Sequence, residues 1–187
     1  MKISFSTLAC PDFSWTDIYS MAKDLGFDGI EVRGLGEDIF AVNARPFTDA
    51  RLPSTIEKLR SLGLEVPCLA SGCSLKYKKD YDKNISEITQ YVVLAKKLGT
   101  PYIRVLGDLH PQAEDEVDDS FAASCLRLLG TIAQGFGVTL LVETNGVYAD
   151  TKRLKALLDQ VNMPSVQALW DMHHPFRYVG ESPAETV

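Results

Sequence analysis

Leu25-Gly26-Phe27-Asp28 is the first of four similar junctions that recur along the chain. Each has a glycine that follows a segment of helical periodicity and precedes a short apolar run. The other three are Leu62-Gly63-Leu64-Glu65, Leu98-Gly99-Thr100-Pro101 and Phe136-Gly137-Val138-Thr139, so the glycines lie 37, 36 and 38 residues apart. Glycine commonly ends a helix because it adopts the left-handed conformation without a steric penalty. The junctions therefore predict a repeated unit in which a strand follows a helix.

Apolar residues at helical spacing mark the segments between the junctions. Ile18, Met21, Ala22 and Leu25 fall at positions i, i+3, i+4 and i+7, which is the spacing of one helix face. Similar stripes run through 85–95, 121–136 and 154–161. Three patterns resemble capping boxes and predict helix starts: Ser14 with Asp17, Ser54 with Glu57, and Asn84 with Glu87.

Six short and mostly apolar runs lie between the predicted helices. Runs of this kind are typical of parallel strands that are covered on both faces. Because they alternate with helices, a right-handed parallel α/β fold is expected. The predicted strands are Ile3–Ser6, Gly29–Arg33, Leu64–Ala70, Tyr102–Leu106, Val138–Glu143 and Val166–Trp170.

Two architectures share this order of elements. A doubly wound nucleotide-binding sheet carries Gly-x-Gly-x-x-Gly at its first strand-to-helix turn, but that turn here is Ala9-Cys10-Pro11-Asp12. A complete (β/α)₈ barrel needs about 250 residues, and the chain has 187. We therefore expect a single TIM-barrel-type domain over residues 1–187, truncated after strand six and lacking strands seven and eight. Ser182-Pro183-Ala184-Glu185 predicts the start of one further helix.

The composition is that of a globular protein with a core, with 45% hydrophobic and 24% charged residues. No apolar stretch approaches the roughly 20 residues of a membrane helix, and the first residues lack the pattern of a signal peptide. The net charge of −6 argues against nucleic acid as the main partner. The four cysteines are scattered and are expected to be buried thiols in a reducing compartment. We therefore expect a cytoplasmic protein that binds neither nucleic acid nor membrane.

Acidic residues follow the apolar parts of the last two predicted strands. Glu143 ends strand five, and Asp171 comes directly after strand six. Because the carboxyl ends of parallel strands meet at one mouth of a barrel, both acids are expected there. Two converging carboxylates raise each other's pKa unless a cation lies between them, so we predict Glu143 and Asp171 as ligands of a divalent metal. The alternative is that both are ordinary carboxylates at loop edges. His173 and His174 follow Asp171, and we expect one to be structural and the other functional.

Further candidates for substrate binding lie at the other strand ends. Glu31 at the end of strand two either binds substrate or forms a structural ion pair with Arg33. Arg104 on strand four either binds substrate or neutralises nearby carboxylates. His110 follows strand four, and Trp15 lies at a helix start, where it either lines the mouth or packs locally. The mixed-charge run 76–83 is interpreted as a solvated loop that could also cover the site.

These motifs resemble the xylose isomerase-like TIM barrel family, in particular its bacterial sugar phosphate isomerases/epimerases. The resemblance runs along the whole chain, and it rests on Gly29-Ile30-Glu31-Val32-Arg33, Ile103-Arg104-Val105-Leu106-Gly107, Leu141-Val142-Glu143-Thr144-Asn145 and Trp170-Asp171-Met172-His173-His174-Pro175. Members bind one divalent metal through Glu, Asp, His and Glu on strands five to eight. The resemblance implies that Glu143 and Asp171 are the first two ligands. It also implies that His174, in the spacing Asp-x-x-His, contacts a substrate oxygen.

The chain also departs from the family pattern. The ligands expected on strands seven and eight have no counterpart in these residues. Ala149 stands where the D-tagatose 3-epimerase branch has a Glu, and Asn145 stands where many relatives have His. The departures argue against ketose 3-epimerase specificity, and they leave the activity of this 187-residue chain open.

The function that the resemblance implies is a metal-dependent sugar (phosphate) isomerase or epimerase. Glu143 would be both ligand and base for proton transfer through an enediolate, while Arg104 and His174 stabilise negative charge. The metal would be Mn²⁺, Mg²⁺, Co²⁺ or Zn²⁺. Two alternatives remain, namely an inosose dehydratase-like lyase and a catalytically incompetent truncated barrel. An endonuclease IV-like enzyme is disfavoured, because it needs many histidines and this acidic chain has three. The open strand edges of a truncated barrel predict a homodimer or strand exchange.

Overall fold

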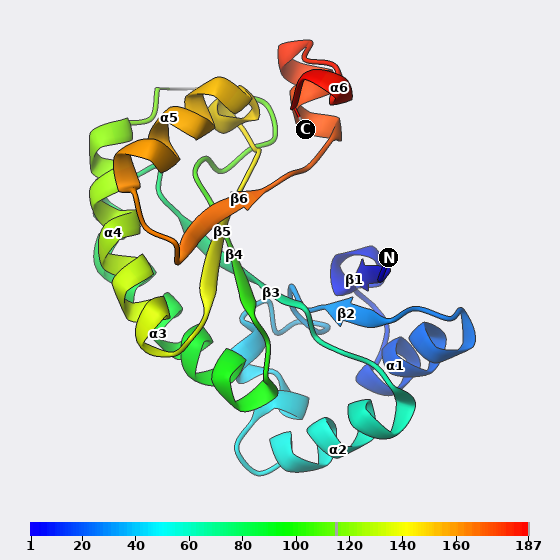
Figure 1. Ribbon diagram of the computed structural model, residues 1–187. Coiled ribbons are helices and arrows are strands. Elements are labelled where there is room, and N and C mark those ends of the chain that lie inside the picture. The colour runs from blue at the N-terminus through cyan, green and yellow to red at the C-terminus, as the bar shows by residue number, and fades with distance from the viewer. Residues whose placement is uncertain (115, 187) are drawn as a thin grey trace. The chain divides into compact units, whose positions relative to one another are not determined.

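The computed structural model of the chain describes residues 1–114 and 116–186. In this described part, short strands alternate with helices along the chain (Figure 1). The strands are β1 (Ser4–Ser6), β2 (Gly29–Glu31), β3 (Cys68–Ser74), β4 (Tyr102–Leu106), β5 (Thr139–Glu143) and β6 (Val166–Leu169). The α-helices are α1 (Trp15–Asp24), α2 (Leu52–Leu62), α3 (Tyr81–Leu98), α4 (Asp119–Gly135), α5 (Thr151–Val161) and α6 (Pro183–Thr186).

The strand pairs are parallel, as the alternation of helices and strands predicts. β1 pairs with β2, with Ser4 opposite Gly29. A second sheet has the strand order β3-β4-β5-β6, and in it Glu143 on β5 lies opposite Leu169 on β6. Within the described residues the strands do not close into a barrel. The fold is therefore parallel α/β, of TIM-barrel type with six strands, as expected.

The described residues group into two compact units. Unit 1 comprises Met1–Ser71 and Gln90–Ile103, and unit 2 comprises Gly72–Thr89 and Arg104–Val187. The single domain expected over residues 1–187 stays a prediction. In the part of the chain that the structure describes, every helix is too short or too polar to cross a membrane.

Unit 1 is built around β1, β2, α1 and α2. Ile18 on α1 and Ile30 on β2 are almost fully buried, which is the burial that the helical stripe and the apolar run predict. The capping box at the start of α1 is confirmed. The Ser14 hydroxyl accepts a hydrogen bond from the Asp17 amide, and the Asp17 carboxylate accepts one from the Ser14 amide. Both bonds satisfy amides that the first helical turn leaves without a partner.

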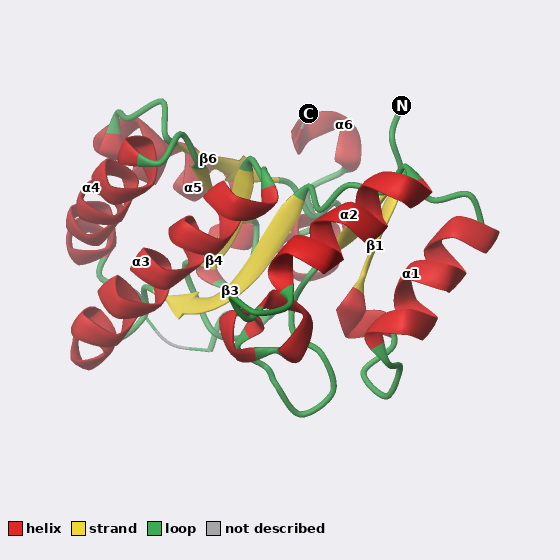
Figure 2. Cartoon of the chain, turned by 90° about the horizontal axis from the view of Figure 1, so that it is seen from below, coloured by secondary structure: helices red, strands yellow, loops and turns green. Residues whose placement is uncertain are grey.

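Unit 2 contains the carboxyl ends of β4, β5 and β6. Helices α4 and α5 pack against each other and against β5 and β6 (Figure 2). Leu126 and Leu129 on α4, Leu140 on β5 and Leu157 on α5 are almost fully buried in this layer. A core packed this closely has little freedom to move, so it fixes the strand ends that carry the predicted site.

The four junction glycines adopt the conformation that their positions predict. The φ angles of Gly26, Gly63, Gly99 and Gly137 are 75°, 70°, 75° and 72°. These values lie in the left-handed region, where any other residue meets a steric penalty. The repeated glycine is therefore confirmed as the signal that ends a helix and leads the chain into a strand.

The third strand lies four residues further along the chain than expected. Leu64–Ala70 is predicted, and β3 spans Cys68–Ser74. Pro67 cannot donate a ladder hydrogen bond, so the regular strand begins after it. The small residues at 71–74 suggest a loop in the sequence, but Gly72 has a packing role. A Cβ at this position would lie 3.2 Å from Oε1 of Glu87.

Two of the three predicted helix starts are wrong. α2 begins at Leu52, so Ser54 lies inside it, and the Ser54 hydroxyl donates to the Arg51 carbonyl. α3 begins at Tyr81, so Asn84 lies inside it as well. The buried Asn84 amide donates to the Ser74 carbonyl at 2.7 Å, and tertiary contacts thus explain a residue that resembles a cap. The further helix is confirmed as α6, with a capping bond from the Ser182 amide to the Glu185 carboxylate.

Most of the run 76–83 is exposed to solvent, as expected, but its first residue is buried and its last three residues belong to a helix. Lys76 at its start is 7% exposed, a 3₁₀ turn spans Lys78–Asp80, and α3 begins at Tyr81. The mixed charges of the run do not distinguish the buried Lys76 from its exposed neighbours. The partner of Lys76 is Asp108, which follows β4 as Lys76 follows β3.

Candidate functional site

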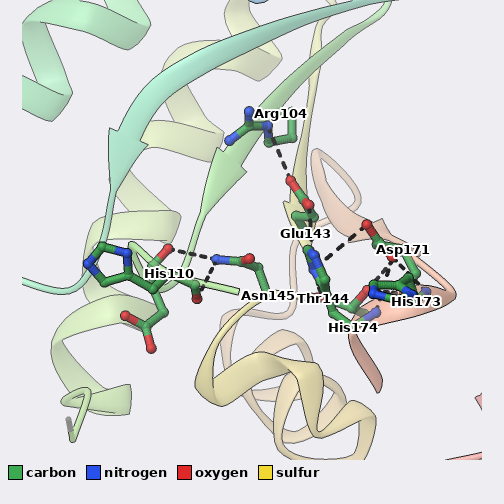
Figure 3. Close-up of polar contacts among 9 residues, drawn as sticks. Arg104, His110, Glu143, Thr144, Asn145, Asp171, His173 and His174 are labelled. Atoms are coloured by element: carbon green, nitrogen blue, oxygen red, sulfur yellow. Dashed lines mark hydrogen bonds and ion pairs between the residues drawn. The ribbon is translucent and has the colours of Figure 1, made fainter. Parts of the chain in front are cut away.

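Glu143 and Asp171 lie close together, as their places after neighbouring parallel strands predict (Figure 3). Glu143 is the last residue of β5, and Asp171 comes two residues after the end of β6. Together with His174 they offer ligand atoms that all lie within 4.8 Å of one another. Within the described residues, no second group of three such side chains occurs. We refer to Glu143, Asp171 and His174 as the acidic cluster.

The Glu143 carboxylate is held between two nitrogen groups. Arg104 on β4 places its Nε 3.3 Å from Oε2 of Glu143, and Nδ1 of His174 lies 3.9 Å from Oε1. The Glu143 side chain is 16% exposed and that of Arg104 is 11% exposed. A carboxylate this far from water needs a nearby positive group. Arg104 supplies it, so the predicted neutralising role of Arg104 agrees with its position.

The Asp171 carboxylate is oriented by the backbone that follows it. Its Oδ1 accepts hydrogen bonds from the amides of His173 at 2.7 Å and His174 at 3.2 Å. This local turn is typical of Asp just before a helical segment. The other oxygen, Oδ2, lies 3.7 Å from Nδ1 of His174. One carboxylate oxygen is thus fixed by the chain, while the second faces the cluster.

The two histidines after Asp171 differ in their surroundings. Nδ1 of His174 lies 3.1 Å from the carbonyl oxygen of Thr144. A carbonyl can only accept, so Nδ1 carries the proton in this contact. The His173 side chain is exposed and its ring lies beside that of Tyr178. The structure therefore brings His174 into the cluster and leaves His173 at its edge.

The donor set of the acidic cluster fits a divalent cation. Carboxylate oxygens this close together, those of Glu143 and Asp171, suit Mg²⁺, Mn²⁺, Co²⁺ or Zn²⁺. The Arg104 guanidinium offers one positive charge against the two carboxylates. Because Nδ1 of His174 is committed to the Thr144 carbonyl, Glu143 and Asp171 are the protein groups that would hold the ion.

His110 lies in the same unit but is not drawn into the cluster. Its side chain is more than half exposed, and Nε2 lies 3.7 Å from a carboxylate oxygen of Glu114. The backbone around it is well fixed, because the Asn145 side-chain amide donates to the carbonyls of Asp108 and His110 at 3.0 and 3.1 Å (Figure 3). Asn145 therefore braces the loop after β4, and substrate contact by His110 stays a prediction.

Two predicted substrate residues belong to unit 1. Glu31 ends β2 and is partly buried, and no ion pair joins it to Arg33 within the described part of the chain. The Arg33 guanidinium instead donates to a backbone carbonyl, that of Ile39, at 3.3 Å. Trp15 begins α1, packs edge-on against Phe47 at 5.3 Å, and lines a cavity of about 550 Å³ within this unit. The substrate roles of Glu31 and Trp15 stay predictions.

The structure contains a buried ion pair, just after the ends of β3 and β4, that the sequence pattern does not predict. Nζ of Lys76 lies 2.9 Å from Oδ1 of Asp108, and the two side chains are 2% and 0% exposed. Asp108 also accepts hydrogen bonds from the amides of Leu109 and Val147. The pair joins the chain after β3 to the chain after β4. A position just past a strand end was the only signal for it.

Thr144 links the chain just after β5 to the backbone of Asp171, which a threonine in the sequence does not by itself indicate. It follows Glu143 directly and is 3% exposed. Its hydroxyl accepts a hydrogen bond from the Asp171 amide at 2.8 Å and donates one to the Asp171 carbonyl at 3.1 Å. Thr144 therefore contacts two members of the acidic cluster and is covalently joined to the third.

Solved structures of known proteins share this fold. The probable 3-DHS dehydratase AsbF of Bacillus anthracis is 22% identical with a TM-score of 0.75, over 93% of this chain and 64% of that one. A xylose isomerase-like TIM barrel protein from Mycobacterium smegmatis, in complex with magnesium, is 17% identical with a TM-score of 0.77, over 97% and 68%. The 3-keto-D-glucoside 4-epimerase YcjR of E. coli is 16% identical with a TM-score of 0.74, over 93% and 69%.

The chain thus spans about two thirds of the length of these structures, and only 64% of the first. At these identities the likeness shows the fold. No curated protein matches the sequence significantly. The family model of the xylose isomerase-like TIM barrel matches residues 20–186, which is most of the chain. The chain therefore belongs to the xylose isomerase-like TIM barrel family.

Proposed function

We propose that the chain carries part of the active site of a metal-dependent sugar isomerase or epimerase. The reaction moves a proton between carbons of a hydroxy-carbonyl sugar or sugar phosphate through an enediolate. The observation that carries the proposal is the acidic cluster, which joins two carboxylates and an imidazole at the ends of two parallel strands. An epimerase, a dehydratase and a magnesium complex on the same fold support it.

Each residue of the cluster has a distinct task in this reaction. A divalent cation held by Glu143 and Asp171 would supply Lewis acidity to the substrate carbonyl. The Glu143 carboxylate accepts the proton from the neighbouring carbon, and such a positioned base contributes about 10²–10⁴-fold in rate. Arg104, 3.3 Å from Oε2 of Glu143, fixes the orientation of that base. The other ring nitrogen of His174, Nε2, binds a substrate hydroxyl in this proposal.

A lyase is the second candidate, because a dehydratase begins with the same step. Once a base has removed the proton next to a carbonyl, a hydroxyl on the adjoining carbon can leave as water. The likeness to a probable dehydratase structure favours this alternative. The two reactions differ in the fate of the intermediate, so their products separate them.

Proton exchange in deuterated water tests the proposed reaction. The full chain is incubated with Mn²⁺ and a panel of aldoses, ketoses and their phosphates. ¹H NMR then follows the signals of the protons on the carbons next to the carbonyl, which disappear as deuterium replaces them. The isomerase predicts deuterium incorporation that a chelator abolishes and that Glu143→Gln reduces by about 10²-fold or more. A dehydratase gives an unsaturated product instead. Exchange that survives both the chelator and Glu143→Gln contradicts the proposal.

Metal binding tests the cluster independently of turnover. Mn²⁺ is titrated into the metal-free chain and followed by electron paramagnetic resonance. Wild type is expected to bind weakly, since only two carboxylates of these residues hold the ion, and Glu143→Gln or Asp171→Asn should abolish the binding. Glu57→Gln is a matched control on an exposed helix surface. Binding without any turnover supports the alternative of a catalytically incompetent chain, and binding that both cluster variants retain contradicts the site.

A further inference from the structure

Thr144 replaces a main-chain hydrogen bond with a side-chain one where β5 and β6 separate. Up to that point the parallel ladder is regular, because the Leu140 amide donates to the Ser165 carbonyl and the Thr144 amide donates to the Leu169 carbonyl. One more regular step would pair the Asp171 amide with the Thr144 carbonyl. The Asp171 amide donates instead to the Thr144 hydroxyl at 2.8 Å.

The substitution frees the Thr144 carbonyl for a different partner. That oxygen lies 3.1 Å from Nδ1 of His174 (Figure 3), so it accepts the imidazole proton. The hydroxyl in turn donates to the Asp171 carbonyl at 3.1 Å. Thr144 therefore holds the Asp171 backbone with its side chain and the His174 ring with its main chain. It thereby contacts both members of the acidic cluster that follow β6.

The position of the Asp171 carboxylate depends on this backbone. Its Oδ1 accepts hydrogen bonds from the amides of His173 and His174, which link the carboxylate to the turn 171–174. Thr144 contacts this turn twice, through its hydroxyl at the Asp171 backbone and through its carbonyl at the His174 ring. Threonine suits the task, because branching at Cβ restricts the side chain to few rotamers.

We propose that Thr144 is a positioning residue that fixes the distance and orientation of Asp171 and His174 relative to Glu143. Its effect on metal affinity rests on the function proposed above, whereas its effect on the turn 171–174 does not. Groups that orient a metal ligand by hydrogen bonding typically contribute about 10- to 100-fold to metal affinity. The Thr144 hydroxyl acts through the Asp171 backbone, to which both of its hydrogen bonds are made.

The test compares Thr144→Val with Thr144→Ser in the metal-free full chain. Valine keeps the shape but loses both hydrogen bonds, while serine keeps the hydroxyl. Thr55→Val is the matched control, because Thr55 is also buried and its hydroxyl donates to the Pro46 carbonyl at 2.7 Å in unit 1. Two readouts are used, namely Mn²⁺ affinity and the ¹H–¹⁵N spectrum of the amides of Asp171, His173 and His174.

Thr144→Val is expected to weaken Mn²⁺ binding by about tenfold, with Thr144→Ser within about twofold of wild type. It should also shift the amides of Asp171, His173 and His174, and Thr55→Val should change neither readout. Unchanged affinity and unchanged amides in Thr144→Val overturn the proposal.

If wild type binds no Mn²⁺, the proposed function fails, and the amide shifts alone decide the role of Thr144. If Thr144→Val does not fold, hydrogen exchange in wild type decides, because rapid exchange of the Asp171 amide overturns the proposal.

Discussion

Lys76 and Asp108 have opposite charges at positions that water hardly reaches. Because their side chains are 2% and 0% exposed, removing one partner leaves the other charge buried without compensation. Loss of one member of such a pair typically costs about 3–5 kcal/mol in the free energy of unfolding. We therefore predict that Lys76→Met destabilises the chain by about this amount, measured by urea denaturation.

The control for this prediction is an exposed pair. Lys155 and Asp159 are also in contact, but their side chains are 75% and 65% exposed. Lys155→Met should therefore change the free energy of unfolding by about 0.5 kcal/mol or less. Equal effects of the two substitutions would contradict the importance of burial at Lys76.

The cysteines are expected to be unreactive while the chain is folded. All four are free and buried, and burial raises the pKa of the Cys125 thiol from 9.0 to about 11. Burial, and secondly the Glu87 carboxylate, raise the pKa of Cys73 further. The thiolate is the reactive form, so at mildly alkaline pH iodoacetamide should label these two only after denaturation. Labelling of Cys73 or Cys125 at equal rates in native and denatured chain would contradict their burial.

The same shift gives a direction to the pH dependence of stability. In the unfolded chain the Cys125 thiol loses its proton near pH 9, and in the folded chain near pH 11. Between these values the unfolded state binds fewer protons, so the free energy of unfolding falls as the pH rises. Urea denaturation at pH values across this window measures the decrease in the free energy of unfolding. Cys125→Ala should make this decrease smaller.

Among the elements, α1 and α2 start in different ways although both sequences suggest a cap. The Ser14 side chain caps α1, whereas Ser54 lies inside α2 and donates to the Arg51 carbonyl. Loss of an N-cap typically costs about 1 kcal/mol. Ser14→Ala should therefore lower the free energy of unfolding by about 1 kcal/mol, and Ser54→Ala by only a few tenths. A larger effect at Ser54 than at Ser14 in thermal or urea unfolding would contradict this assignment.

The sequence predicts most strands to within one or two residues. β4 has its predicted bounds, and β1, β5 and β6 differ from prediction by one residue each. For β5 the apolar run is bounded by a glycine and an acid, Gly137 and Glu143, which leaves little choice. β3 is shifted because Pro67 interrupts the run and small residues pack inside the strand. The proximity of Glu143 and Asp171 follows from the strand-end rule. The roles of Thr144 and Lys76 could not be predicted, because they depend on register and side-chain direction.

The outer edge of β6 has no strand beside it in the described part of the chain. Two of its four residues, Gln167 and Ala168, are exposed. The segment that follows also exposes apolar side chains, and Trp170, Met172 and Phe176 are 41%, 61% and 60% exposed. Open strand edges beside apolar surface favour pairing with another chain. The homodimer or strand exchange expected from the sequence stays a prediction.

We therefore predict that the chain self-associates through the edge of β6. The alternating ladder turns the Ala168 amide away from β5, so this residue lies at the centre of the free edge. A lysine on an edge strand opposes pairing between like chains, because it adds charge that would have to be buried.

Sedimentation velocity over a wide range of concentration should show association in wild type and a monomer in Ala168→Lys. Gln160→Lys, on the exposed surface of α5, adds the same charge away from the edge and should leave association unchanged. A wild-type chain that stays monomeric at every concentration contradicts the prediction, and a dimer that Ala168→Lys retains places the interface elsewhere.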